Sequence, residues 1–404
     1  MINIAILGFG VVGAGVAEVI AMNSDSIAQH LGEELKVKRI LDIRDFPDSP
    51  FADLVTHESS DVFGDPDIKV VVETIGGAKI AYEFTKQALS AGKSVVTSNK
   101  ELVATHGVEL MELAKANGCQ YLYEAAVGGG IPIIRPLHRC LAANKILRIA
   151  GIVNGTTNYI LTNMRTSGLS YDDALAQAQA KGYAEQNPSA DVDGIDAQRK
   201  LSILSSIALN GEYVSPEEIN TTGISAIKLD DINFATRIGC AIKLLAVFSH
   251  MDEGKPSAFV APFFVAKKSQ LAPVEGVFNA ILVKGNAVGT TMYYGRGAGK
   301  LPTASAVVGD VLEAARAPEA NAYTKNWHKS DARVTAEFGD IKTNIIVRAK
   351  AGSMENLNDK FSSYNTSSVW DGNDCCAIIV YDILHKDIEK LVSSVGGNWL
   401  HYME

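Results

Sequence analysis

The chain has 404 residues, 47% of them apolar, and its 46 acidic and 37 basic residues give a formal net charge of −9 at pH 7. This length allows two or three domains, and the apolar content is ample for their cores. The acidic balance, without any basic block, argues against nucleic acid and membranes as partners. The five cysteines form no Cys-x-x-Cys pair, so we expect a reducing cytoplasm and no zinc framework.

The N-terminal segment MINIAILGFGVVG combines an alternating apolar strand with a glycine-rich turn in G-x-G-x-x-G spacing, and a helix-compatible run follows over 15–22. One glycine allows the tight turn, one lets the backbone approach a pyrophosphate, and one permits close helix packing. A strand before and a helix after the turn favour a Rossmann-type dinucleotide site. The cofactor residues expected here are Gly8, Phe9, Gly10, Val12 and Gly13.

Two other interpretations of this segment fit less well. A signal peptide would begin with basic residues, and none precedes Lys36. A transmembrane helix has a suitable length by hydropathy, but the glycines and Glu18 argue against it.

The segment LKVKRILDIRD over 35–45 predicts a second strand whose end meets the adenosine ribose. An acid there favours NAD and an arginine favours the 2′-phosphate of NADP, and both Asp42 and Arg44 are present. Alternating side chains would place the two on one face of the strand. Because Arg44 lies nearer the loop, we expect NADP, with NAD use left open.

Further apolar strands are predicted over 70–77, 94–104 and 119–134, separated by helical stretches over 78–91 and 102–117. Such strands, ending in small or polar residues, are typical of a parallel sheet whose strand ends line a ligand crevice. Thr74 is therefore a candidate cofactor contact and Lys100 a candidate site residue. Lys100 could also be an ordinary lysine at a helix start, although a basic residue is mildly unfavourable there.

The most informative stretch is AQAKGYAEQNPSADVDGIDAQRK over 178–200, a glycine- and proline-shaped loop followed by a helical pattern. Asp196 and Lys200 lie four residues apart and share a helix face. An amino-acid substrate needs carboxylates for its ammonium group, and alcohol or aldehyde chemistry needs a proton carrier. The alternative is a set of helix caps beside a solvated surface pair.

The order of elements indicates an α/β fold with three parts. A cofactor domain covers residues 1–130 with a returning helix at about 304–320, and a substrate domain covers 131–303. Strands predicted over 146–152, 259–264, 280–284 and 289–294 give this α+β domain a mixed sheet, which we expect to build a dimer interface. The tail over 340–404 reads as β-α-β-β-α-β, the ferredoxin-like order.

With these motifs the chain resembles the homoserine dehydrogenases over essentially its full length. The family signature is met at Ala178, Gly182, Tyr183, Ala184, Asn187, Pro188, Asp191, Val192, Gly194, Asp196 and Lys200. Supporting matches are GFGVVG (8–13), ETIGG (73–77), TSNKELVA (97–104), EAAVGGGIP (124–132), NGTTNYI (154–160) and YGRGAGKLPTASAVVGD (294–310).

The resemblance implies a reversible NAD(P)-dependent interconversion of L-homoserine and L-aspartate 4-semialdehyde, within threonine and methionine synthesis. At matching positions, Lys200 corresponds to the proton donor and acceptor, and Lys100 lies between cofactor and substrate. Glu185 corresponds to a position near the substrate ammonium and the nicotinamide, with Gly182 beside it. The remaining substrate-binding positions are Asp191, Asp196, Thr156 and Tyr183. Gly297 and Gly299 join the cofactor set.

The chemistry agrees with these roles. Hydride addition to an aldehyde leaves an alkoxide, which a nearby ammonium stabilises and protonates. A lysine is ordinarily protonated at neutral pH, which suits reduction, so the oxidative direction should improve as pH rises.

The resemblance also implies a cation and a regulatory module. In the family, main-chain carbonyls hold a monovalent cation, usually sodium, and the matching residues are Glu124, Val127, Gly129 and Ile131. A glycine-rich hinge is the alternative. The tail resembles the ACT modules of some family members by topology only, so threonine feedback and an oligomerisation role both stay open.

Two rival functions differ in their residues. One is another amino-acid-linked Rossmann oxidoreductase, such as an aspartate-semialdehyde or saccharopine-type enzyme. The first of these would need a nucleophilic cysteine near a histidine, and no cysteine here lies in a strand-end Gly/Asn context. A non-catalytic cofactor sensor would not need Lys100, Asp196 and Lys200. We expect a cytoplasmic homodimer or homotetramer that acts on a small-molecule substrate.

Overall fold

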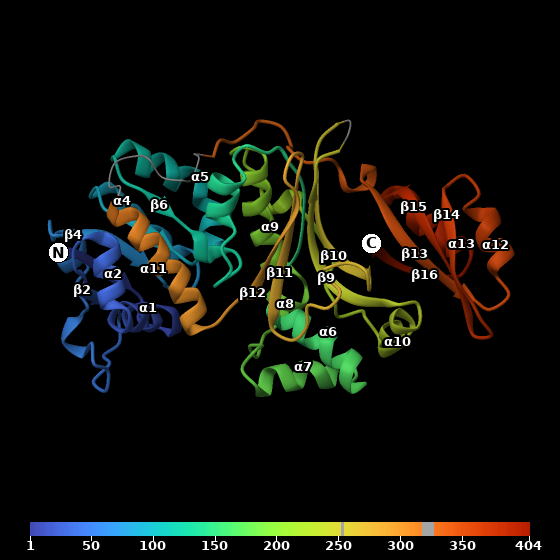
Figure 1. Cartoon of the computed structure of the whole chain (residues 1–404), viewed down its shortest axis with the longest axis horizontal. Helices are drawn as coiled ribbons and strands as arrows, with labels where there is room; N and C mark the ends of the chain where they lie inside the picture. The colour runs from blue at the N-terminus through green and yellow to red at the C-terminus, as the bar shows by residue number, and fades with distance from the viewer. Residues whose placement is uncertain (252–253, 317–326) are drawn as a thin grey trace. The chain divides into compact units, whose positions relative to one another are not determined.

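The computed structural model describes residues 1–251, 254–316 and 327–404 (Figure 1). The chain forms two compact units, each assembled from three stretches of sequence. The first unit comprises Met1–Ile146, Ser202–Pro216 and Gly285–Ala332, and the second comprises Leu147–Leu201, Glu217–Lys284 and Arg333–Glu404. The three-domain division expected above stays a prediction.

The first unit contains a six-stranded parallel sheet with the order β3-β2-β1-β4-β5-β6. Its strands are β1 (Ile2–Leu7), β2 (Leu35–Leu41), β3 (Val55–Thr56), β4 (Ile68–Glu73), β5 (Ser94–Thr97) and β6 (Tyr121–Leu122). This is the strand order of dinucleotide-binding domains, in which ligands bind at the carboxyl ends of the strands. The predicted Rossmann-type sheet is therefore confirmed.

Helices cover this sheet because β1, β4 and β5 are almost entirely apolar and buried. They are α1 (Val11–Met22), α2 (Ser24–Leu31), α3 (Ser60–Phe63), α4 (Lys79–Ser90), α5 (Lys100–Ala116) and α11 (Lys300–Arg316). The late helix α11 returns to pack on α1, as Figure 1 shows. A Cβ on Gly15 would lie 2.9 Å from the Lys300 carbonyl oxygen, closer than real Cβ atoms come, so this packing needs a glycine.

Four strands are shorter than the sequence predicts. The strand expected over 70–77 ends at Glu73, whose carboxylate accepts the Ile75 N–H. The strand expected over 35–45 ends at Leu41, because the Asp42 carboxylate accepts the Phe9 and Arg44 N–H groups and draws the chain out of the ladder. The strand expected from 94 ends at Thr97, since Asn99 caps α5. The strand expected over 119–134 covers only β6 and passes into short helical turns, Glu124–Ala126 and Pro136–Cys140.

The second unit contains a mixed sheet with the order β11-β7-β9-β10-β16-β13-β15-β14, and β8 pairs with β10. Its strands are β7 (Ile146–Ile152), β8 (Asn220–Thr221), β9 (Cys240–Ser249), β10 (Ser257–Ala266), β11 (Phe278–Gly285), β13 (Lys342–Lys350), β14 (Thr366–Asp371), β15 (Cys375–Leu384) and β16 (Asn398–Met403). Both β9 and β10 are buried along nearly their whole length, so this sheet is covered on both faces. The mixed sheet predicted from sequence is present.

The helices of the second unit are α6 (Gly155–Ser167), α7 (Tyr171–Ala180), α8 (Ser189–Val192), α9 (Ile195–Ala208, whose last residues are assigned to the first unit), α10 (Leu229–Arg237), α12 (Met354–Lys360) and α13 (His385–Ser394). The tail follows the order β13-α12-β14-β15-α13-β16, and its strands lie side by side as β16-β13-β15-β14. This confirms the predicted ferredoxin-like topology. Its own core includes Ile345, Leu357, Phe361 and Val380.

No single helix in the described parts of the chain is long and apolar enough to cross a membrane. Together, α1 and α2 meet the length and composition test, but the chain bends by 77° between them. Most apolar side chains of α1 are buried against the sheet and α11.

Candidate active site

The glycine turn after β1 has the geometry that its spacing predicts. Gly8 has φ +85°, a conformation that favours glycine, and a Cβ on Gly13 would lie 2.1 Å from the Gly8 carbonyl oxygen. A Cβ on Gly10 would meet nothing within 4 Å. The protein itself therefore requires Gly8 and Gly13, whereas the open space at Gly10, before the N-terminus of α1, fits the approach of a phosphate group.

The turn is held from two sides. The Thr74 hydroxyl, just beyond β4, donates to the Gly8 and Leu7 carbonyl oxygens at 2.7 and 3.0 Å. The Phe9 N–H donates to the Asp42 carboxylate at 2.7 Å, and the buried Phe9 ring packs against Phe46. Val12 is half-buried in the first turn of α1.

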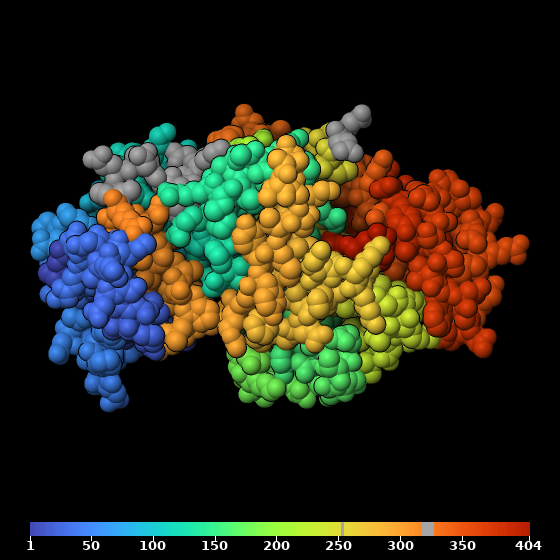
Figure 2. Space-filling model, viewed as in Figure 1, coloured from blue at the N-terminus to red at the C-terminus, as the bar shows by residue number. Residues whose placement is uncertain are grey.

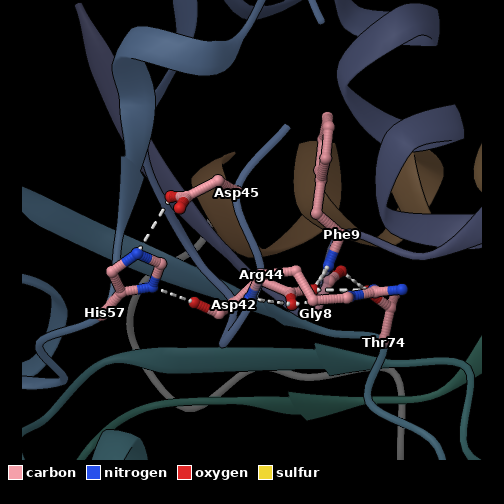
Figure 3. A network of polar contacts seen from close by, with 7 residues as sticks. All are labelled: Gly8, Phe9, Asp42, Arg44, Asp45, His57 and Thr74. Atoms are coloured by element: carbon pink, nitrogen blue, oxygen red, sulfur yellow. Dashed lines mark hydrogen bonds and ion pairs between the residues drawn. The ribbon is translucent and has the colours of Figure 1, made fainter. Parts of the chain in front are cut away.

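Asp42 and Arg44 gave conflicting indications for NAD and NADP in the sequence. In the structure they form one hydrogen-bonded unit (Figure 3). The Arg44 main-chain N–H donates to Asp42 Oδ1 at 3.0 Å, and its Nε and Nη2 donate to the two carboxylate oxygens at 3.1 Å each. Burial alone would raise the pKa of Asp42, but the hydrogen bonds from Arg44 and Phe9 outweigh burial and hold the pKa below its usual value. The Arg44 side chain is 60% exposed, so its guanidinium still faces solvent.

Lys100 is the first residue of α5 and is half-buried. The preceding residue, Asn99, caps the helix by accepting the Leu102 N–H at 3.0 Å. Lys100 therefore lies beside the carboxyl end of β5, at the edge of the sheet where the crevice was predicted.

The segment predicted to hold a cation curls tightly. Gly128 and Gly129 have φ +76° and +54°, and a Cβ on Gly129 would lie 2.3 Å from the Gly297 carbonyl oxygen. The buried Glu124 carboxylate accepts the N–H groups of three residues, and these are Ile133, Ile134 and Arg135. Glu124 can therefore offer a cation its carbonyl oxygen, not a free carboxylate. The neighbouring Gly299 also has a positive φ, +125°.

In the second unit, Lys200 and Asp196 form a buried ion pair on α9. Lys200 Nζ lies 2.6 Å from Asp196 Oδ2 and 2.7 Å from the Val153 carbonyl oxygen. The two residues are 8% and 5% exposed. The alternative of a solvated surface pair is therefore wrong.

The structure adds Asn154 to this cluster, a residue to which the sequence analysis gave no role. Its Nδ2 donates to Asp191 Oδ1 at 2.7 Å and to Asp196 Oδ2 at 2.9 Å, while its Oδ1 accepts the Thr157 N–H at 2.8 Å. Asn154 thus caps α6 and joins both carboxylates. The signal in the sequence was its place as the first residue of the NGTTNYI motif (154–160).

Of the other predicted substrate residues, Thr156 lies in the first turn of α6, and Tyr183 and Glu185 lie in the loop before α8. The Thr156 hydroxyl donates to the Tyr183 carbonyl oxygen at 2.7 Å, and the Tyr183 ring packs edge-on against Tyr159. Gly182 has φ +72°, and Gly182, Tyr183 and Glu185 are exposed. The loop is tied to α6, but these contacts do not bring the Glu185 side chain into the buried cluster.

Comparison with known proteins agrees with this geometry. Residues 132–312 match a family model described as homoserine dehydrogenase, and residues 8–124 match one described as its NAD-binding domain. The chain is 43% identical to a homoserine dehydrogenase of Pseudomonas aeruginosa over 317 residues, covering 78% of this chain and 73% of that protein. It is 36% identical to that of Bacillus subtilis over 375 residues, covering 91% and 86% of the two chains.

Solved structures give the same result. A homoserine dehydrogenase from Thiobacillus denitrificans has a TM-score of 0.90 at 35% identity, covering 100% of this chain and 98% of that one. A hyperthermophilic archaeal homoserine dehydrogenase in complex with NADPH has a TM-score of 0.65 at 33% identity, covering 78% and 97%. The chain therefore belongs to the homoserine dehydrogenase family, whose members are NAD(P)-dependent oxidoreductases acting on a small-molecule substrate.

Proposed function

We propose that this protein interconverts L-homoserine and L-aspartate 4-semialdehyde with NADP as the preferred coenzyme, and that Lys200 carries the proton. The observation that supports this most directly is the buried pair of Lys200 and Asp196. A lysine held by a carboxylate and a carbonyl oxygen inside a protein costs free energy of desolvation, which a surface lysine does not. A catalytic role for Lys200 explains why the protein keeps a buried lysine despite this cost.

The bound nicotinamide supplies a hydride to the substrate or accepts one from it. During reduction, the aldehyde oxygen gains negative charge, and Lys200 donates a proton to it. During oxidation, the neutral amine of Lys200 takes the hydroxyl proton. Asp196 orients Nζ at 2.6 Å and balances the charge of the ammonium form.

The substrate would be oriented by groups around this pair. The carboxylates of Asp191 and Asp196, joined through Asn154, offer negative charge to the amino group of homoserine. Gly182, Tyr183 and Glu185 lie in the loop expected beside the substrate, and Thr156 on α6 holds this loop through the Tyr183 carbonyl oxygen.

The first unit has the features that a dinucleotide needs. The N–H groups at the start of α1 fit the pyrophosphate. Arg44, oriented by Asp42, has guanidinium donors that face solvent and suit the 2′-phosphate of NADP. Thr74, Lys100, Gly297 and Gly299 remain the other candidates for cofactor contact.

We also propose a monovalent cation, sodium, in the loop over 124–131, because a hard cation prefers oxygen ligands. Among the described residues, no main-chain hydrogen bond outside helices and strands ends on the carbonyl oxygens of Val127, Gly129 or Ile131. The positive φ values of Gly128 and Gly129 let the chain curl so that such oxygens converge. The cation would stabilise this loop and take no part in proton transfer.

We also propose a cytoplasmic homodimer or homotetramer with an ACT-like tail. The strand β12 (Gly289–Arg296) lies at the surface in Figure 2 and exposes large apolar side chains. Met292 is 38% exposed and Tyr294 is 55% exposed. Such side chains suit an interface between copies of the chain.

The assignment of Lys200 is tested by homoserine oxidation and aspartate-semialdehyde reduction with wild type, Lys200→Ala and Lys284→Ala. Loss of a general acid–base group is expected to lower kcat by about 10²- to 10⁴-fold in Lys200→Ala. Lys284 is an exposed lysine of the same unit, and its removal should leave kcat within about twofold, as for an ordinary surface substitution. A folded Lys200→Ala variant with near-wild-type kcat would refute the proton-carrier role.

A further inference from the structure

A buried carboxyl group joins the two turns that follow β4 and β5. Glu73 is the last residue of β4 and is fully buried. Its Oε1 accepts the Ile75 N–H at 2.6 Å, and its Oε2 accepts the Thr97 hydroxyl at 2.5 Å. One oxygen thus holds the turn after β4, and the other holds the end of β5.

Asn99 closes this network. Its main-chain N–H donates to Thr97 Oγ1 at 2.9 Å, and its Nδ2 donates to the carbonyl oxygens of Ile75 and Gly77 at 3.3 and 2.8 Å. Its Oδ1 caps α5 through the Leu102 N–H. One side chain therefore ties the turn after β4 to the start of α5.

This arrangement exceeds what the fold alone needs. A buried carboxyl group is costly, and burial raises the pKa of Glu73 to about 7 despite the hydrogen bonds from Thr97 and Ile75. A helix cap could be supplied equally well by serine, which would make no bridge to the neighbouring turn.

The turns that the network joins are those that carry candidate site residues. The turn after β4 includes Thr74, whose hydroxyl holds the Gly8 carbonyl of the glycine turn. The turn after β5 leads directly into Lys100. Three strand ends, those of β1, β4 and β5, are thereby linked by hydrogen bonds at the edge of the sheet where a dinucleotide binds.

We propose that Glu73, Thr97 and Asn99 are positioning residues. They hold the Thr74 turn and Lys100 in place, so that the coenzyme-binding site is already formed before the coenzyme binds. A coenzyme that binds to loose turns must order them first, and that ordering weakens binding. The part of the proposal that concerns Lys100 rests on the function proposed above. The part that concerns coenzyme binding does not.

Asn99→Ser and Thr97→Val test the proposal, with NADPH binding followed by fluorescence titration of the full-length protein. Asn99→Ser keeps a good cap but removes the two bonds to Ile75 and Gly77, so NADPH should bind about tenfold more weakly. Thr97→Val should weaken binding to a similar degree, because it removes the links to both Glu73 and Asn99. We expect kcat to fall in both variants by more than any change in the KM for homoserine, since Lys100 is displaced.

Two further variants separate positioning from a general effect on folding. Thr97→Ser keeps the hydroxyl group and should restore NADPH affinity to within about twofold of wild type, as for a conservative replacement. Thr105→Val removes a hydroxyl from the same helix outside the network, where it donates to the Glu101 carbonyl oxygen at 2.7 Å. This control should bind NADPH normally.

Unchanged NADPH affinity in Asn99→Ser and Thr97→Val would overturn the proposal, as would an equal loss in Thr105→Val. If Thr97→Val fails to fold, Asn99→Ser with its intact cap decides the question alone. Because NADPH binding is measured without turnover, the result is independent of whether Lys200 carries the proton.

Discussion

Arg44 is the side chain on which the choice between NADP and NAD is expected to depend. The sequence placed an acid and an arginine together and so gave conflicting signals. The structure shows that the two are partners, with Asp42 accepting four hydrogen bonds from Arg44 and Phe9. A carboxylate has about four acceptor positions, so Asp42 cannot bind ribose hydroxyls unless it releases Arg44.

Arg44→Ala should therefore change the coenzyme preference. Loss of a charged hydrogen-bond donor costs about 1.5–3 kcal/mol, which predicts a roughly 10- to 150-fold rise in the KM for NADP. The KM for NAD should stay level or fall, because Asp42 becomes available to the ribose. Steady-state kinetics with both coenzymes measure this, and Arg44→Lys serves as the control that keeps the charge but loses the paired geometry. An equal effect on NADP and NAD would exclude Arg44 from the 2′-phosphate site.

For Lys200 and Asp196, the residue types and their spacing could be read from the sequence, but their burial could not. An Asp/Lys pair four residues apart looks the same in sequence whether it faces solvent or the interior. The role of Asn154 could not be predicted from the sequence either, because its contacts with Asp191 and Asp196 join residues 37 and 42 positions apart. Contacts of that range are set by tertiary packing, which brings α8 against α6.

Among the secondary-structure elements, α13 provides a test of pH dependence. His385, its first residue, is buried beside Phe338, Phe259 and His401. Burial lowers the pKa of His385 to about 4 and holds the pKa of His401 well below its usual value of 6.5. Both rings are therefore neutral in the folded protein at physiological pH.

The sign of the effect follows from linkage. His385 becomes protonated near pH 6.5 in the unfolded chain but only near pH 4 in the folded protein. The free energy of unfolding therefore decreases as the pH falls from 6.5 to about 4, and His385 causes no further decrease below that. His385 contributes at most about 3 kcal/mol to this loss. Thermal unfolding of wild type, His385→Phe and the exposed-histidine control His30→Gln, at several pH values, should show a shallower acid dependence in His385→Phe alone. An unchanged slope in that variant would mean that His385 titrates normally when folded.

The elements themselves were largely predictable, and their ends were not. Apolar periodicity located β1, β4 and β5 and the helices between them, because buried parallel strands need continuous apolar runs. The end of β2 depends on the Asp42 carboxylate bonding to Phe9, a residue 33 positions away. The end of β6 depends on Glu124 turning back to the N–H groups of residues 133–135.

For the whole molecule, the open question with the clearest test is self-association through β12. The side chains of Met292 and Tyr294 are exposed on this strand. Met292→Asp would bury a charge in the proposed interface and should shift the protein toward the monomer, by sedimentation velocity at micromolar concentration. Ile80→Asp, at an apolar residue of α4 that is 58% exposed, is the matched control and should leave the assembly unchanged. A Met292→Asp protein with the wild-type sedimentation coefficient would place any interface elsewhere.

The amino-acid sequence by itself determined the fold class, the glycine turn and the family, because these depend on local spacing: a strand, three glycines, a helix, and a signature with fixed intervals. The tertiary structure alone decided that Lys200 and Asp196 are buried, that Arg44 is held by Asp42, and that Glu73 links two strand ends through Thr97. The physical reason is range. Each of these facts depends on desolvation or on a hydrogen bond between residues that only the folded chain brings together. Neither burial nor such a contact can be read from the spacing of residues in the sequence.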